Sequence, residues 1–186
     1  MTKVLPRRLR GFTLVELMTG VAIVGILAVL GVVLIGKQLR ATQSEEAMTV
    51  VQSIRAAEER YRAENRQYLD VSTTLTTYYP GDSDGKKRSF FRSAAPSPPL
   101  DALDARWRLL APTISTPVMF GYAVVAGNPG TPMATPSTAN KPVWPTDPVE
   151  PWYVIQAEAD GNNDGTKCWV VSSSLNGEVY VENEGE

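Results

Sequence analysis

The sequence predicts an α+β fold, in which a long N-terminal helix packs on an antiparallel sheet of about four strands. Residues 12–68 contain an apolar run followed by an amphipathic pattern, with no proline to interrupt a helix. The rest contains β-branched and aromatic runs of strand length between segments rich in proline and glycine. We therefore expect four parts: a basic segment at 1–11, a membrane-spanning helix at 12–36, its amphipathic continuation at 37–68 and a globular β-rich head at 69–186.

The composition argues against several classes of function. The chain of 186 residues contains no histidine, which removes the commonest general base and metal ligand. Zinc enzymes and Ser-His-Asp or Cys-His hydrolases are therefore not expected, and we predict that the protein is not an enzyme. A net charge of −2 gives no sign of a nucleic-acid partner. The single cysteine, Cys168, allows no internal disulfide, and its strand-like context predicts a small core residue.

The N-terminal segment has the charge distribution of a membrane protein whose start stays in the cytoplasm. The basic residues before Gly11 leave 14 basic against 20 acidic residues in the rest of the chain, a net charge of −6. The nineteen residues from Leu17 to Ile35 carry no charge, which is enough to cross about 30 Å of hydrocarbon as a helix. The four basic residues are Lys3, Arg7, Arg8 and Arg10.

Two simpler explanations of this segment leave a feature unexplained. A secretory signal peptide predicts a shorter apolar region and a small-residue cleavage site, whereas this run is long and residues 36–39 make a poor site. A plain N-terminal anchor explains the length and the basic flank. It does not explain Glu16, because a carboxylate at the start of a membrane segment is costly.

The stretch Gly11-Phe12-Thr13-Leu14-Val15-Glu16 resembles the type III signal sequence of type IV pilins and of type II secretion pseudopilins. The resemblance extends over residues 7 to about 70 and implies a pilin-like fold. It implies that prepilin peptidase cuts between Gly11 and Phe12 and then N-methylates Phe12, so that the apolar helix stays in the mature protein. It assigns Glu16 a role in assembly, in which the carboxylate pairs with the Phe12 amine of the same or a neighbouring subunit.

The apolar segment departs from the pattern of major pilins at one position that affects how easily the helix unwinds. Many major pilins carry a proline about two-thirds along the apolar segment, where this chain has Val33. Glycines at four positions weaken the helix by up to about 1 kcal/mol each relative to alanine and allow close approach of neighbouring helices. Whether the helix partly unwinds in a filament is left open. The glycines are Gly20, Gly25, Gly31 and Gly36.

The resemblance implies a structural subunit, major or minor, of a type IV pilus that serves motility, adhesion or DNA uptake. A type II secretion pseudopilin uses the same signal and is the nearest alternative. A membrane-anchored periplasmic binding domain that never polymerises is an alternative of another class, and an anchored enzyme is a third. The implied partners are other pilin subunits, prepilin peptidase, the inner-membrane assembly platform and the membrane. The implied location is the bacterial inner membrane with the head in the periplasm, and after assembly the pilus surface or a periplasmic pseudopilus.

Beyond the membrane segment, residues 41–72 contain neither proline nor glycine. We expect one continuous helix from Phe12 to about Tyr68, whose apolar stripe packs against the head. Glu58 and Arg62 stand four residues apart in the favourable order, which predicts an ion pair on the solvated side. The stripe consists of Ala47, Val50, Val51, Ile54, Ala57 and Tyr61.

In the head, thirteen of the fourteen prolines lie between Pro80 and Pro151, which argues against long helices there. The dipeptide Asn176-Gly177 predicts a two-residue hairpin turn. Loops at 80–99 and 127–151 are expected to be exposed and variable. Strand-like runs occur at 105–110, 118–126, 152–159, 167–174 and 178–182.

The only cofactor suggested is an optional calcium ion. Asp160, Asn162 and Asp164 alternate and are followed by Gly165, a pattern in which a short loop wraps a hard cation. Some pilins and pseudopilins bind calcium in a C-terminal loop, which this one resembles. The bidentate glutamate of an EF-hand is missing, and any tight hairpin uses the same residue types. A weaker candidate at 81–85 offers Asp82 and Asp84.

Overall fold

The computed structural model describes residues 12–81, 84–91, 100–139, 141 and 143–184, and it confirms the α+β class. The chain divides into two compact units, Met1–Gln38 and Leu39–Glu186. The helices and strands, in chain order, are α1 (Leu14–Asn65), α2 (Leu100–Leu110), β1 (Gly121–Gly127), β2 (Trp152–Ala159), β3 (Cys168–Ser173) and β4 (Val179–Glu182).

Helix α1 confirms the predicted continuous helix, with both ends slightly inside the expected bounds. Its last residue is Asn65, because Arg66 adopts the left-handed conformation with φ of 61°. The Arg66 amide still donates to the Arg62 carbonyl at 2.8 Å, which satisfies one of the carbonyl groups that a helix end leaves open. The chain then turns back along the helix.

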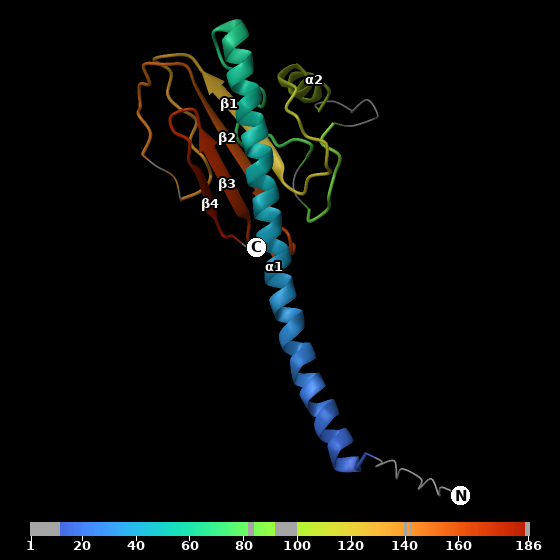
Figure 1. Ribbon diagram of the computed structural model, residues 1–186. Coiled ribbons are helices and arrows are strands. Elements are labelled where there is room, and N and C mark those ends of the chain that lie inside the picture. The colour runs from blue at the N-terminus through green and yellow to red at the C-terminus, as the bar shows by residue number, and fades with distance from the viewer. Residues whose placement is uncertain (1–11, 82–83, 92–99, 140, 142, 185–186) are drawn as a thin grey trace, which may run out of the picture. The chain divides into compact units, whose positions relative to one another are not determined.

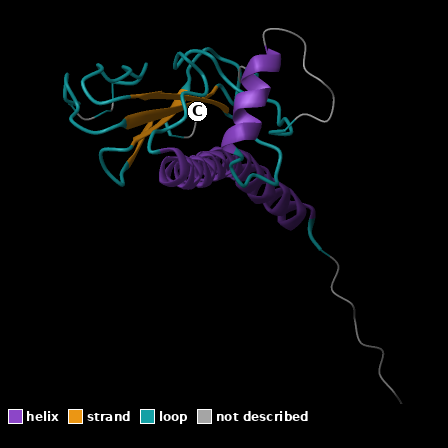
Figure 2. Cartoon of the chain, turned by 90° about the horizontal axis from the view of Figure 1, so that it is seen from above, coloured by secondary structure: helices purple, strands orange, loops and turns teal. Residues whose placement is uncertain are grey.

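The four strands form one antiparallel sheet in the order β1-β2-β3-β4 (Figure 1). Successive side chains of β2 point to opposite faces, so Tyr153 and Ile155 belong to one buried cluster and Trp152 and Val154 to another. The first cluster also contains the apolar stripe of α1. Within the head, the C-terminal half of α1 therefore covers one face of the sheet, as predicted (Figure 2).

The opposite face of the sheet is covered too. Half-buried Met133 and Trp144 pack on it, and Pro148 is buried, whereas most described residues of the 127–151 segment are exposed, as predicted. Buried Gln156 accepts from the Ser137 amide at 2.7 Å and donates to the Leu75 carbonyl at 3.2 Å. One polar side chain of β2 thus holds two covering segments, and this explains why β2 is buried on both faces.

Residues 105–110 were predicted to form a strand, and this is wrong: they belong to helix α2. Leu103, Trp107 and Leu110 are buried at helical spacing, whereas Leu109 is 60% exposed. The alternation that suggested a strand came from Arg106 and Arg108 beside apolar neighbours. The prolines flank this short helix without entering it, since it ends before Pro112.

The other strands lie where the sequence predicts them, with two local differences. Strand β1 begins at Gly121, because Val118 instead forms an isolated bridge with Arg88. The two-residue turn at Asn176-Gly177 is wrong, since β3 ends at Ser173 and β4 begins at Val179. The Ser174 amide donates to the Tyr153 carbonyl at 3.1 Å, which draws the chain toward β2 and lengthens the connection.

Candidate functional site

The first described residues form a capping box at the start of α1. Thr13 precedes the helix, and its amide and hydroxyl donate to Glu16 Oε2 at 3.0 and 2.9 Å. The Glu16 amide in turn donates to Thr13 Oγ1 at 3.2 Å. These reciprocal bonds satisfy amide groups that the first turn of a helix leaves without partners. Glu16 therefore has a local role in helix initiation that the sequence analysis did not identify, although the Thr-x-x-Glu spacing is the signal for it.

The Glu16 carboxylate is exposed, and so is the side chain of Phe12, at 86%. Gly11, the other residue of the predicted cleavage site, lies outside the described residues. In the uncut chain the Phe12 nitrogen belongs to a peptide bond. It would become an amine only if the chain were cut between Gly11 and Phe12.

The first half of α1 has an uncovered apolar surface on all sides. The stretch Leu14–Gly31 is long and apolar enough to cross a membrane, with a mean hydropathy of 2.3, and none of it is buried within the chain. A helix that is apolar all round requires lipid or other helices around it. Its large exposed side chains are Leu14, Val15, Leu17, Met18, Val21, Ile23, Val24, Ile26, Leu27, Val29 and Leu30.

The predicted calcium loop is closed by its own hydrogen bonds. The Asp160 carboxylate accepts from the amides of Asp164 at 3.1 Å and Gly165 at 2.9 Å. Asn162 donates its side-chain amide to the Asp164 carboxylate at 2.8 Å, and the Thr166 amide donates to the same carboxylate at 2.7 Å. The structure therefore brings the three predicted ligands together in a turn that Asp and Asn side chains also build without metal. Among the described residues, no group of three or more His, Cys, Asp or Glu side chains is placed to hold a metal ion.

The weaker acidic stretch at 81–85 lies beside this loop. A Cβ added at Gly85 would be 3.3 Å from the Gly161 carbonyl oxygen. Asp84 pairs with Arg88 at 2.9 Å and with Lys86 at 3.8 Å, so two cations already compensate its charge. Asp82 lies outside the described residues.

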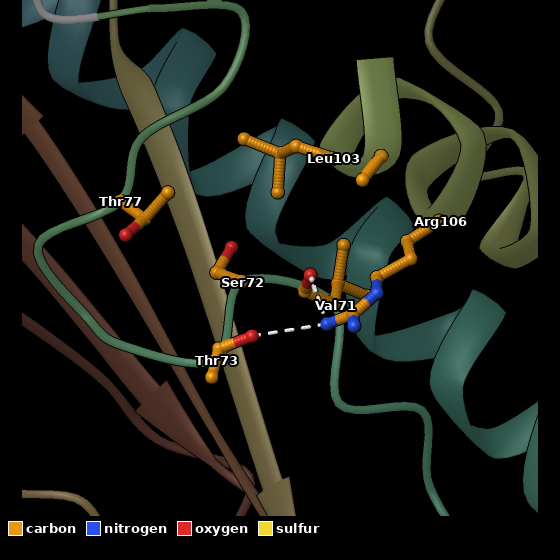
Figure 3. A pocket seen from close by; sticks show the side chains of 7 residues that line it. Val71, Ser72, Thr73, Thr77, Leu103 and Arg106 are labelled. Atoms are coloured by element: carbon orange, nitrogen blue, oxygen red, sulfur yellow. Dashed lines mark hydrogen bonds between the residues drawn. The ribbon is translucent and has the colours of Figure 1, made fainter. Parts of the chain in front are cut away.

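A cavity of about 240 Å³ lies between α2 and the segment that follows α1. Figure 3 shows Arg106 reaching from α2 toward Val71 and Thr73 at its edge. Arg106 Nη1 donates to Thr73 Oγ1 at 3.0 Å and to the carbonyl oxygens of Val71 at 3.4 Å and Asp70 at 3.3 Å. The guanidinium thus holds a backbone segment in place. We find in this cavity no nucleophile with an adjacent base among the described residues.

The C-terminal hairpin is attached to α1 by an arginine. Arg55 donates from Nη2 to the Asn176 carbonyl and from Nη1 to the Gly177 carbonyl, each at 2.9 Å. Cys168 is fully buried, as predicted, and its sulfur lies 3.7 Å from the Ser44 hydroxyl on α1. Hydrogen bonds and packing thus connect this region to the helix, and Cys168 is not in a disulfide.

The predicted ion pair between Glu58 and Arg62 is wrong. Glu58 is fully buried, and its Oε2 accepts the Leu69 amide at 2.9 Å. Burial raises the pKa of Glu58 to about 8, against the lowering effect of that bond. Arg62 instead donates to the Tyr68 hydroxyl at 2.8 Å and lies 3.6 Å from Glu150. The sequence did contain an indication that Glu58 is buried, because it follows the buried Ile54 by one helical turn.

Comparison with known protein families agrees with this N-terminal geometry. The prokaryotic N-terminal methylation motif matches residues 6–35. Neither the curated proteins nor the solved structures contain a match to the chain. The matched segment contains three of the four basic residues before Gly11, the Thr13–Glu16 capping box and the uncovered apolar part of α1. The chain therefore carries, over residues 6–35, the prepilin signal that type IV pilins and pseudopilins share.

Proposed function

We propose that this protein is a structural subunit, major or minor, of a type IV pilus, without catalytic activity of its own. Its partners are other pilin subunits, prepilin peptidase, the inner-membrane assembly platform and the lipid bilayer. Before assembly the protein lies in the bacterial inner membrane with its head in the periplasm, and after assembly it lies in the pilus at the cell surface. Such a filament serves motility, adhesion or DNA uptake.

The observation that supports this proposal is the match of the methylation motif to residues 6–35, together with the apolar side chains of Leu14–Gly31 that the chain itself does not cover. A membrane anchor explains the apolar side chains alone. The motif supports processing of the N-terminus, which a plain anchor does not need. We assign the cut to the bond between Gly11 and Phe12 and the methylation to Phe12. Intact mass and N-terminal sequencing of membrane-extracted protein test this step, and retention of residues 1–11 in cells with active peptidase would contradict it.

In the mature subunit we assign the Glu16 carboxylate to assembly. Cleavage creates a cationic amine on Phe12, and pairing it with Glu16 of the same or a neighbouring chain removes an uncompensated charge from the hydrocarbon. In the capping box Glu16 Oε2 accepts the two hydrogen bonds from Thr13. The same carboxylate would therefore both cap the helix and pair with the amine. We expect Glu16→Ala to leave membrane insertion and cleavage intact and to reduce strongly the amount of subunit in sheared filaments.

A type II secretion pseudopilin is the alternative that the same motif supports. Fractionation distinguishes the two functions: pilus subunits appear in the sheared extracellular fraction, whereas pseudopilin loss blocks release of exoproteins. A non-polymerising periplasmic binding domain predicts that neither the wild type nor Glu16→Ala appears in the sheared filament fraction. Wild-type filament levels of Glu16→Ala would instead show that assembly does not need the Glu16 carboxylate.

A further inference from the structure

Glu58 differs from the other buried acidic side chains of the described residues. Its side chain is 0% exposed, and among the described residues no cation lies within salt-bridge distance of it. By contrast, Asp104 is paired with Arg108 and Glu158 with Lys167, and both carboxylate oxygens of Asp160 accept backbone amides. Glu58 Oε2 accepts one amide, from Leu69, while Oε1 is buried and has no hydrogen-bond partner within the described part of the chain. Burial of the ionised carboxylate in this setting costs a desolvation free energy that the neutral carboxylic acid does not.

The groups that face Glu58 increase this cost. Glu59 on α1 and Asp70 after it both raise its pKa, in addition to the larger effect of burial. From the sheet, Tyr153 lies close enough to interact with Glu58, and burial raises the pKa of that tyrosine while Arg55 lowers it. Glu58 therefore faces two carboxylates and a neutral phenol.

The Leu69 amide, which donates to Glu58, begins a segment that is also hydrogen-bonded to strand β1 and to helix α2. The Asp70 carboxylate accepts the Ala126 amide at 3.4 Å, and the Ser72 amide donates to the Val124 carbonyl at 2.8 Å, so residues 70–72 line the edge of β1. Arg106 donates to backbone carbonyls of the same segment. Helix α1 holds the start of this segment at two adjacent residues: Glu58 accepts the Leu69 amide, and the Tyr68 hydroxyl is bonded to Arg62 and Glu59.

We propose that Glu58 is a proton-operated latch: the neutral carboxylic acid holds Leu69 against α1, and ionisation releases residues 69–73 from α1 and from the edge of β1. Among the described residues no cation can compensate the ionised side chain inside the fold, so ionisation favours an open state in which Leu69 moves away and Glu58 is hydrated. Release also moves Asp70 away from Glu58, which removes the repulsion between the two carboxylates. Since Val71, Ser72 and Thr73 line the cavity beside α2, opening of the latch changes its shape (Figure 3).

Amide hydrogen exchange of the full chain in detergent micelles, measured from pH 6 to 9, tests the latch. Glu58→Gln keeps the shape and the acceptor oxygen but cannot ionise, and Glu64→Gln is a matched control at an exposed position of α1. The ratio of wild-type to Glu58→Gln exchange at each pH cancels the intrinsic pH dependence of exchange. With a pKa of about 8 in the closed state and 4.5 in the open state, the opening constant of the Leu69 amide should rise about tenfold between pH 7 and 9.

Three results support the latch together: this rise in the wild type and in Glu64→Gln, its absence in Glu58→Gln, and a Leu69 amide less protected than the Ile155 amide of β2. The same rise in Glu58→Gln would overturn the assignment to Glu58. No rise in the wild type would overturn the latch. Equal protection of Leu69 and Ile155 at every pH would overturn it too, because exchange would then follow global unfolding alone.

Discussion

Arg55 on α1 donates a hydrogen bond of 2.9 Å to the carbonyl oxygen of Gly177, in the connection between β3 and β4. A second bond of the same length goes to the carbonyl of Asn176. The last two strands are thus joined to the helix without a covalent link. The guanidinium meets both backbone acceptors with two separate nitrogens, which a lysine could not reproduce.

The first prediction concerns this contact. Arg55→Met keeps much of the aliphatic stem and removes both bonds. A buried bond to a charged group contributes roughly 1.5–3 kcal/mol, but one of these two bonds is exposed and the other only partly buried. The free energy of unfolding should therefore fall by about 2–3 kcal/mol for the pair. Denaturant titration of the full chain in micelles measures the change. Gln52→Met, at an exposed position of the same helix, is the control and should change stability by less than about 0.5 kcal/mol. Equal stabilities of the two variants would show that the arginine does not fasten the hairpin.

The second prediction concerns pH. The pKa of Glu58 in the fold, about 8, is above its ordinary value of 4.5, so the folded state binds one more proton than the unfolded state between these values. Stability from this group is therefore fully present below pH 4.5 and is lost progressively as the pH rises to about 8. The denaturation midpoint of the wild type should be higher at pH 6 than at pH 8.5. Glu58→Gln should remove the part of this difference that comes from ionisation of Glu58. A variant as pH-sensitive as the wild type would locate the titration elsewhere.

The third prediction distinguishes helix α2 from the strand that the sequence suggested. Leu110 is fully buried and its neighbour Leu109 is 60% exposed. Leu110→Ala should cost about 2–5 kcal/mol because it leaves a cavity, whereas Leu109→Ala should cost less than about 0.5 kcal/mol. Thermal unfolding of both variants under identical conditions compares them directly. A strand would place Leu109 on the same face as Trp107, and then Leu109→Ala would be the more damaging change.

Calcium binding at Asp160, Asn162 and Asp164 stays a prediction. A cation would have to replace the Asn162 side-chain amide on the Asp164 carboxylate, because that contact occupies one of its oxygens. If the loop binds calcium, millimolar calcium should raise the melting temperature of the full chain relative to chelator, and Asp164→Ala should remove the rise. Superimposable melting curves would mean that hydrogen bonds alone close the loop.

The sequence predicted correctly those helices and strands in which the pattern of apolar residues is long and regular. Helix α1 and strand β2 have such patterns, and β2 was predicted to the residue. Short elements were less reliable, since over six residues the alternation of arginines with apolar residues imitates a strand, and only tertiary packing reveals the helical face of Trp107 and Leu110. The turn at Asn176-Gly177 failed because Arg55 and Tyr153 hold the connection from outside it.

The polar interior was the least predictable part. Glu58 was interpreted by its charge and its spacing to Arg62, although its position one turn after Ile54 placed it on the buried stripe. Gln156 lies in the middle of an apolar strand, and its partners come from segments 19 and 81 residues away. No local pattern specifies such partners, because they depend on how the covering loops return to the sheet.

The capping box has one more consequence. Thr13 and Glu16 both follow the proposed cleavage site, so the helix keeps its complete start signal when residues 1–11 are removed. If the chain is cut there, residues 1–11 serve processing and are not needed to form the first turn of α1. A chain that is synthesised without them and delivered by another route should still form the same first helical turn, with Phe12 as its new terminus.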